Sequence, residues 1–229
     1  MIPFLIAAAV AAAAPAGGCP DVVTPEALVC RALQAQKAGN AESAAQAFEE
    51  AAKASSDKDP ATARMWAAAG NMWIAAGQPG KAALALDRAL ALPGLQAEQR
   101  GEALLDRARA AEAQNDLKTA RAKLNQAAAS ISADPFYWYF SAALAIREGD
   151  KATAQSAIAK ALSLAPSEPA VLFEAGHVAH FLGNVDQARS YWMRAAASDP
   201  NGKVGKTAAK AVEMLGVTPT VKVQAPSSK

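Results

Sequence analysis

The two histidines of the chain, His177 and His180, have the residue type and spacing that could bind a metal ion. On a helix, residues three apart lie on one face, and Glu174 would lie one turn before His177. Ligands from a single helix need a further ligand from elsewhere to complete a site, and both cysteines are distant in sequence. The zinc-protease pattern of two histidines four apart does not occur. We therefore expect no metal, no cofactor, and two imidazoles that pack or face a groove.

Other catalytic signatures are absent from the sequence. No glycine-rich phosphate loop follows a strand, and there is no Gly-x-Ser-x-Gly elbow. The 23 basic and 21 acidic residues are interspersed and leave a net charge of +2, which gives no nucleic-acid footprint. We predict a protein without enzymatic activity and without a nucleic-acid partner. The alternative is a metal-binding or catalytic helical protein that uses Glu174, His177 and His180.

The first residues indicate export. Residues 2–14 are almost wholly apolar and uncharged, and Ala14-Pro15-Ala16 follows as a small-x-small cleavage site. This apolar stretch is shorter than the roughly 20 residues of a membrane span. We predict a signal peptide over residues 1–16. No Lys or Arg precedes the apolar core, and a retained N-terminal membrane anchor is therefore the alternative.

The two cysteines, Cys19 and Cys30, both follow the predicted cleavage site. An even number of cysteines in an exported chain favours a disulfide, which would tie the segment 17–24 to the first helix. Two alternatives stay open. Cys19 could carry lipid after processing at Ala16-Gly17-Gly18, although Ala16 stands where a lipoprotein site usually has Leu, or both thiols could be free.

A pattern of turn residues and apolar helix positions recurs every 34 residues in the rest of the chain. Residues 151–166 predict a helix with one apolar face, bracketed by Gly149-Asp150 and Pro166. The apolar positions of this helix and of the equivalent helix 34 residues later are Ala154, Ile158, Ala161 and then Ala188, Trp192, Ala195. A fixed period of this length is typical of stacked helix pairs. Abundant alanine, which allows helices to approach closely, agrees with an all-α fold.

Each repeat follows the same pattern. Its first helix carries a bulky residue, a small residue four positions later and another bulky residue three positions after that, and a turn and a second helix follow. Trp66, Gly70 and Trp73 show it most plainly, before the turn at Gly77. The pattern resembles the tetratricopeptide repeat family, which implies an all-α, right-handed solenoid of about five helix hairpins with a C-terminal capping helix. In that frame Gly70 allows the partner helix to approach. The repeat domain would span 25–215, with units near 25–58, 63–96, 101–134, 135–168 and 169–202, a cap helix at 203–215 and a disordered tail at 216–229.

The run of aromatic residues from Phe136 to Phe140 stands at the start of the fourth unit. The family pattern assigns Trp138 to the core. Phe136 and Tyr139 would line the concave groove, where exposed aromatics can be binding hot spots, or pack against neighbouring units. The other residues that the resemblance assigns to the groove are Arg64, Asn71, Glu102, Arg109, Arg147, Phe173, His177 and His180.

The resemblance implies a non-enzymatic scaffold that binds a protein or peptide partner in its groove. The groove residues lack the dense Lys/Asn set with which co-chaperones of this family hold a carboxyl terminus. Bacterial envelope proteins of the family act in complex assembly, and we predict a periplasmic or otherwise exported protein. Contact with a membrane would come only from an uncleaved N-terminus or a lipidated Cys19.

Overall fold

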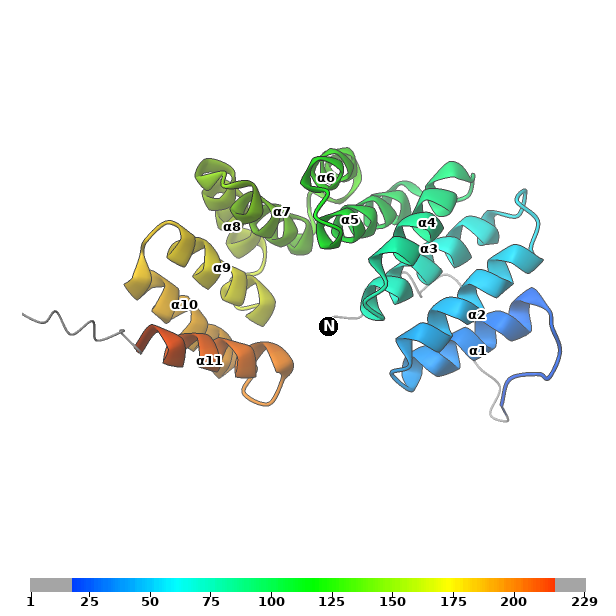
Figure 1. Cartoon of the computed structure of the whole chain (residues 1–229), viewed down its shortest axis with the longest axis horizontal. Coiled ribbons are helices and arrows are strands. Elements are labelled where there is room, and N and C mark those ends of the chain that lie inside the picture. The colour runs from blue at the N-terminus through cyan, green and yellow to red at the C-terminus, as the bar shows by residue number, and fades with distance from the viewer. Residues whose placement is uncertain (1–17, 217–229) are drawn as a thin grey trace, which may run out of the picture. The chain divides into compact units, whose positions relative to one another are not determined.

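A computed structural model describes residues 18–216, which form α-helices and no strands (Figure 1). The first six helices are α1 (Pro25–Lys37), α2 (Ala41–Ala54), α3 (Pro60–Ala75), α4 (Pro79–Ala91), α5 (Ala97–Ala113) and α6 (Leu117–Ile131). The others are α7 (Pro135–Glu148), α8 (Lys151–Leu164), α9 (Pro169–Phe181), α10 (Val185–Ser198) and α11 (Lys203–Gly216). Successive helices pack in pairs, α1 with α2 through α9 with α10. The predicted all-α repeat architecture, five helix pairs and a final helix, is confirmed.

The short turns inside the pairs are built by two adjacent residues with different tasks. The first residue ends one helix in the left-handed conformation, as Gly39, Asn115 and Gly149 do with φ of 76°, 62° and 75°. In three of the five turns the second residue caps the next helix, because its side chain accepts a main-chain N–H, whereas Gln78 and Asn184 form no such bond. Asn40 accepts from Ser43, Asp116 from Thr119 and Asp150 from Thr153. These caps explain why Gly-Asn, Asn-Asp and Gly-Asp mark the turns in the sequence.

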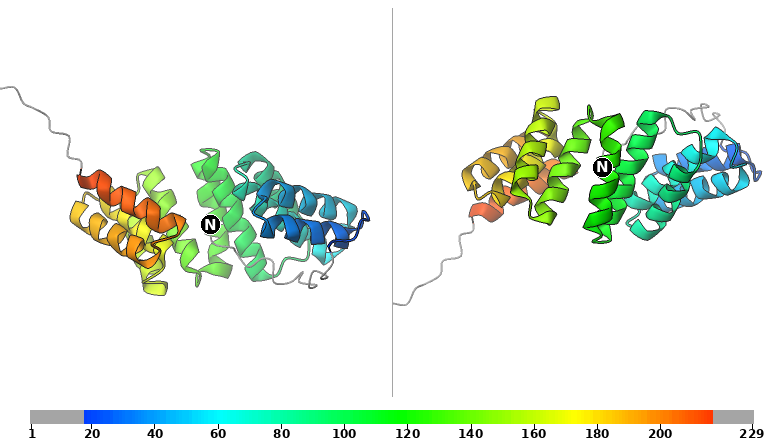
Figure 2. Two further views of the ribbon diagram at one scale, coloured as in Figure 1. Left: turned by 90° about the horizontal axis from the view of Figure 1, so that it is seen from below. Right: turned by 90° about the horizontal axis from the view of Figure 1, so that it is seen from above.

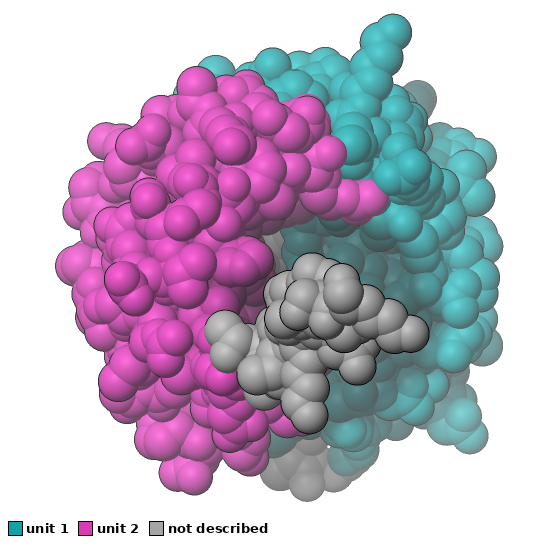
Figure 3. All heavy atoms as spheres, turned by 60° about the vertical axis from the view of Figure 1, so that its left-hand side comes forward, with its two compact units in different colours: residues 1–133 teal, residues 134–229 magenta. Residues whose placement is uncertain are grey.

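The described residues fall into two compact units, with the boundary in the chain between residues 133 and 134 (Figure 3). Unit 1 holds α1 to α6 and unit 2 holds α7 to α11, and within each unit the helices follow one another in chain order (Figure 2). The boundary coincides with the start of the fourth predicted repeat. A single repeat domain over 25–215 stays a prediction.

Small residues let the large core residues enter between paired helices. In unit 1, a Cβ on Gly70 of α3 would overlap the side chain of Leu86 on α4, which is fully buried. In unit 2, a Cβ on Gly176 of α9 would overlap the indole of Trp192 on α10. The predicted role of Gly70 in close approach is confirmed, and Gly176 has the same role in the second unit.

The aromatic run in α7 differs from the expectation. Tyr137 and Phe140 are buried, whereas Trp138, the predicted core residue, is only partly buried. Tyr137, Phe140 and Leu144 are spaced three and four apart and therefore share the buried face of the helix. Trp138 lies beside that face, where it packs against the core cluster and against Tyr137, with ring centroids 5.0 Å apart.

The final helix, α11, packs on α10 and α9, with Ala208 buried and Val212 and Leu215 against the core. The predicted signal peptide (1–16) and all but the first residue of the predicted tail lie outside the described residues. None of the helices between residues 18 and 216 has the length and apolar character needed to cross a membrane.

Candidate partner-binding surfaces

A buried carboxylate joins the first helices of two neighbouring pairs in unit 1. Asp106 on α5 is 4% exposed. Its Oδ2 accepts a hydrogen bond from Nδ2 of Asn71 on α3 at 2.7 Å, and its Oδ1 accepts from a terminal guanidinium nitrogen of Arg109 at 2.8 Å. We call the surface formed by Arg64, Asn71, Asp106 and Arg109 the α3–α5 face. A buried carboxylate is tolerated because both its oxygens have charged or polar partners.

The hydrogen bonds to Asp106 leave other polar groups of the α3–α5 face available to a partner. The side-chain oxygen of Asn71 accepts no hydrogen bond from the described residues, and the Arg109 side chain is 35% exposed. Arg64 lies seven residues before Asn71 on the same helix, and its Nε is buried without a partner among residues 18–216. The face therefore offers an oriented acceptor beside oriented donors, the combination that a peptide main chain requires.

Arg64, Asn71 and Arg109 were among the predicted groove residues, whereas Asp106, which orients Asn71 and Arg109, was not. A signal was present, because Glu102, Asp106 and Arg109 are spaced four and three apart and share one helix face. Glu102 is partly buried on α5.

The two histidines belong to an aromatic cluster in unit 2. His177 lies against Phe173 and Trp192, with ring centroids 4.4 and 5.5 Å away, and His180 lies 6.0 Å from Trp192. The indole nitrogen of Trp192 donates to the main-chain oxygen of Phe173 at 2.9 Å. Packing thus accounts for the position of both imidazoles.

Glu174 is 6% exposed, and its Oε2 lies 3.2 Å from Nδ1 of His177. Among the described residues no group of three or more His, Cys, Asp or Glu side chains is placed to hold a metal ion. The metal-binding alternative therefore has no ligand set in this part of the chain.

Three further predicted groove residues come from α7. The rings of Phe136 and Tyr139 contact each other edge to face, with centroids 6.2 Å apart, and both residues are partly buried. Arg147 is exposed in the last turn of the same helix. Phe136 and Tyr139 thus form one aromatic pair in unit 2, as their spacing of three residues implies.

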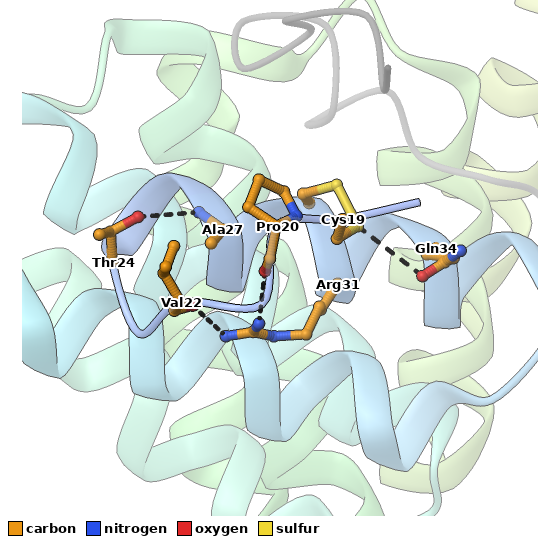
Figure 4. The surroundings of a disulfide bond; sticks show 8 residues. Cys19, Pro20, Val22, Thr24, Ala27, Arg31 and Gln34 are labelled. Atoms are coloured by element: carbon orange, nitrogen blue, oxygen red, sulfur yellow. Dashed lines mark hydrogen bonds between the residues drawn. A yellow bond between two sulfur atoms is a disulfide. The ribbon is translucent and has the colours of Figure 1, made fainter. Parts of the chain in front are cut away.

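The two cysteines form a disulfide, with a Cα–Cα distance of 5.7 Å (Figure 4). Arg31, next to Cys30 on α1, donates to the main-chain oxygens of Pro20 and Val22, both at 3.0 Å. Cys30 and Arg31 together hold the segment before α1 against that helix (Figure 4). The contribution of Arg31 was not foreseen from the sequence.

A pocket of about 810 Å³ lies on another surface of unit 1, between the second helices of the first two pairs. Its floor is formed by Trp66 and Trp73 of α3, and its two walls come from α2 and α4. We call it the α2–α4 furrow. The predicted groove lies on the first helices of the pairs, and the sequence did not predict the α2–α4 furrow.

Comparisons with known proteins agree on the fold. The family model described as Tetratricopeptide repeat matches residues 137–168, which include α8 and most of α7. No curated protein sequence matches the chain. Similar solved structures include MamA (19% identity, TM-score 0.58, covering 77% of this chain and 92% of that one). PilW, described as a widely conserved type IV pilus biogenesis factor, has 21% identity and a TM-score of 0.66, and the alignment covers 80% of this chain and 81% of that one.

YrrB, described as a TPR protein with an unusual peptide-binding site, has 17% identity and a TM-score of 0.55, and the alignment covers 80% of this chain and 91% of that one. At these identities the likeness shows a shared fold.

Proposed function

We propose that this chain, which has the fold of tetratricopeptide-repeat proteins and matches their family model over residues 137–168, is a non-enzymatic scaffold that binds an extended segment of a partner protein. The proposed activity is recognition, in which no covalent bond is made or broken. The observation that carries the proposal is the buried Asp106, which holds Asn71 and Arg109 in fixed orientations on the α3–α5 face. Side chains that are ordered before binding lose less conformational entropy when the partner arrives.

The chemistry of the α3–α5 face indicates what it would bind. Asn71 can accept a main-chain N–H through its free oxygen, and Arg109 keeps donors for a carbonyl or carboxylate oxygen. Arg64 adds a second guanidinium on the same surface. Because the α3–α5 face carries two guanidinium groups and one amide, we expect the bound segment to be extended and to carry an acidic residue.

In unit 2, we propose that Phe136 and Tyr139 of α7 contribute aromatic contacts to the partner, with Arg147, Phe173, His177 and His180 as the remaining candidates. The edge-to-face pair of Phe136 and Tyr139 forms a rigid apolar element, of the kind that is enriched at interaction hot spots.

We further propose that the protein acts in the cell envelope. Residues 1–16 have the pattern of a signal peptide, and a disulfide such as Cys19–Cys30 is typical of proteins in an oxidising compartment. A role for PilW in pilus biogenesis is compatible with such a location for a protein of this fold. A membrane-attached form, with an uncleaved N-terminus or lipid on Cys19, would have a different intact mass, and mass spectrometry of the protein from cells separates these cases.

Affinity capture from an envelope extract, followed by mass spectrometry, tests the scaffold. The captured segment would then be synthesised and its binding measured by fluorescence anisotropy. We expect Asn71→Ala with Arg109→Ala to weaken binding at least tenfold, and Phe136→Ala with Tyr139→Ala to weaken capture. Lys160→Ala, an exposed change on α8, serves as the control. Equal binding by the wild-type and Asn71/Arg109 variants, with the helical circular-dichroism signal intact, would refute the α3–α5 assignment.

A further inference from the structure

The α2–α4 furrow has walls of different charge above an aromatic floor. On the α4 wall, Lys81 and Arg88 are exposed, and Asp87 is already paired with Arg107 of α5 at 2.9 Å. On the α2 wall, Glu49 accepts from Lys53 at 2.7 Å and from Nε1 of Trp73 at 3.1 Å. Glu50 has no ion-pair partner among the described residues. The charges left for a ligand are therefore positive along α4 and negative along α2.

The furrow also exposes apolar surface between its charged walls. Leu84 lies on α4 between Lys81 and Arg88 and is 72% exposed. The Nζ of Lys81 stacks over the ring of Trp73, 4.2 Å from its centroid, so that this cation is held at the edge of the furrow. A ligand must therefore combine an apolar stripe with charged flanks.

The walls favour a helical ligand over an extended one. Both walls are α-helices, whose main-chain groups are hydrogen-bonded internally and offer nothing to a peptide backbone. Gln46 is the one neutral amide side chain that lines the pocket. An extended segment would leave most of its own N–H and C=O groups without partners, at a cost for each buried group. In a helical ligand the main-chain N–H and C=O groups are hydrogen-bonded within the helix, so that only its side chains need partners in the furrow.

We propose that the α2–α4 furrow binds an amphipathic helix of a partner protein, independently of the α3–α5 face. The apolar stripe of that helix covers Leu84 and the tryptophan floor. Lys81 and Arg88 are seven residues apart, about 10 Å along α4, and they pair with carboxylates two turns apart on one edge of the partner. A basic residue on its other edge pairs with Glu50.

A synthetic peptide tests this proposal on the full chain. The probe is a labelled peptide of about two heptads with leucines at a and d, glutamates at e and lysines at g, which is too short for a stable coiled coil of its own. We expect saturable binding by fluorescence anisotropy. Lys81→Glu with Arg88→Glu should weaken it at least tenfold, and replacing the peptide's glutamates by lysine should restore binding to that variant. Arg88→Glu alone keeps the contact between Lys81 and Trp73 and should weaken binding several-fold.

Two control variants show whether the peptide binds specifically at this furrow. Lys118→Glu with Lys160→Glu makes the same charge change on exposed positions of α6 and α8 and should leave binding unchanged. Asn71→Ala with Arg109→Ala should also leave it unchanged in variant protein that keeps its helical circular-dichroism signal, because neither side chain lines the furrow. The proposal is overturned if the wild-type chain does not bind the peptide. It is also overturned if replacing the control lysines weakens peptide binding as much as replacing Lys81 and Arg88, or if the lysine-substituted peptide does not bind the Lys81→Glu, Arg88→Glu variant.

Discussion

The side-chain amide of Asn71 on α3 donates a 2.7 Å hydrogen bond to the buried carboxylate of Asp106 on α5. The two residues are 35 positions apart in the chain and belong to different helix pairs. Because the same carboxylate also holds Arg109, this one contact ties the packing of two repeats to the geometry of the proposed binding face.

Replacing Asp106 by Ala should therefore reduce both stability and binding. Hydrogen bonds to a charged group contribute about 1.5–3 kcal/mol, and we expect the free energy of unfolding to fall by this amount. Urea denaturation followed by circular dichroism measures the loss. In a double-mutant cycle with Asn71→Ala, the two changes should be non-additive by at least about 0.5 kcal/mol. Strict additivity would show that the contact is not energetically coupled.

Gly176→Ala should destabilise unit 2 although alanine is the better helix former. The propensity gain is about 1 kcal/mol. The added methyl group would overlap the indole of Trp192, which is buried and fixed by its bond to Phe173, and overpacking of this kind costs about 1–3 kcal/mol. We expect a net lower melting temperature. Gly80→Ala on α4 is the matched control, since nothing lies within 4 Å of its new Cβ, and it should be neutral or stabilising.

Reduction of the disulfide should destabilise unit 1 without unfolding its helices. The cysteines are 11 residues apart in sequence, and the loop-entropy model gives about 2–3 kcal/mol for a loop of this size. Thermal unfolding with and without a reductant checks this value. The double variant Cys19→Ser with Cys30→Ser should match the reduced wild type and be insensitive to reductant. A wild-type curve that does not move on reduction would contradict the prediction.

Asp116 should give the stability a component that depends on pH. The side chain and the main-chain N–H of Thr119 donate to its carboxylate, which lowers its pKa. A carboxyl group whose pKa is lower in the folded state stabilises above its unfolded pKa of about 3.9, and this contribution is lost as pH falls through the folded value. The melting temperature of Asp116→Ala should therefore lie below wild type at pH 7, with a gap that narrows below about pH 4.

The matched control for Asp116 is Asn40→Ala. Asn40 caps α2 through the same type of hydrogen bond, from the N–H of Ser43, but it carries no charge. Its loss should lower the melting temperature by an amount that changes little between pH 7 and low pH. A gap for Asp116→Ala that stays constant with pH would contradict the role given to its charge.

Features that depend on neighbours along the chain were predictable from the sequence. The 34-residue period, the turn and cap pairs such as Gly149-Asp150, and the need for a small residue at Gly70 all arise within one helix pair. Helix periodicity and capping are local, and each repeat shows them again. The spacing of Phe136 and Tyr139 likewise implied that their rings share a helix face.

Features that depend on contacts between helix pairs were decided only by the tertiary structure. Asp106 looks like an ordinary surface carboxylate until α3 brings Asn71 to it. The burial of Tyr137 and Phe140 instead of Trp138 depends on which face of α7 is covered by other helices. The α2–α4 furrow exists because α3 sets two second helices apart with Trp66 and Trp73 between them. Sequence spacing fixes which side chains share a face, whereas the packing of several helices determines what each face meets.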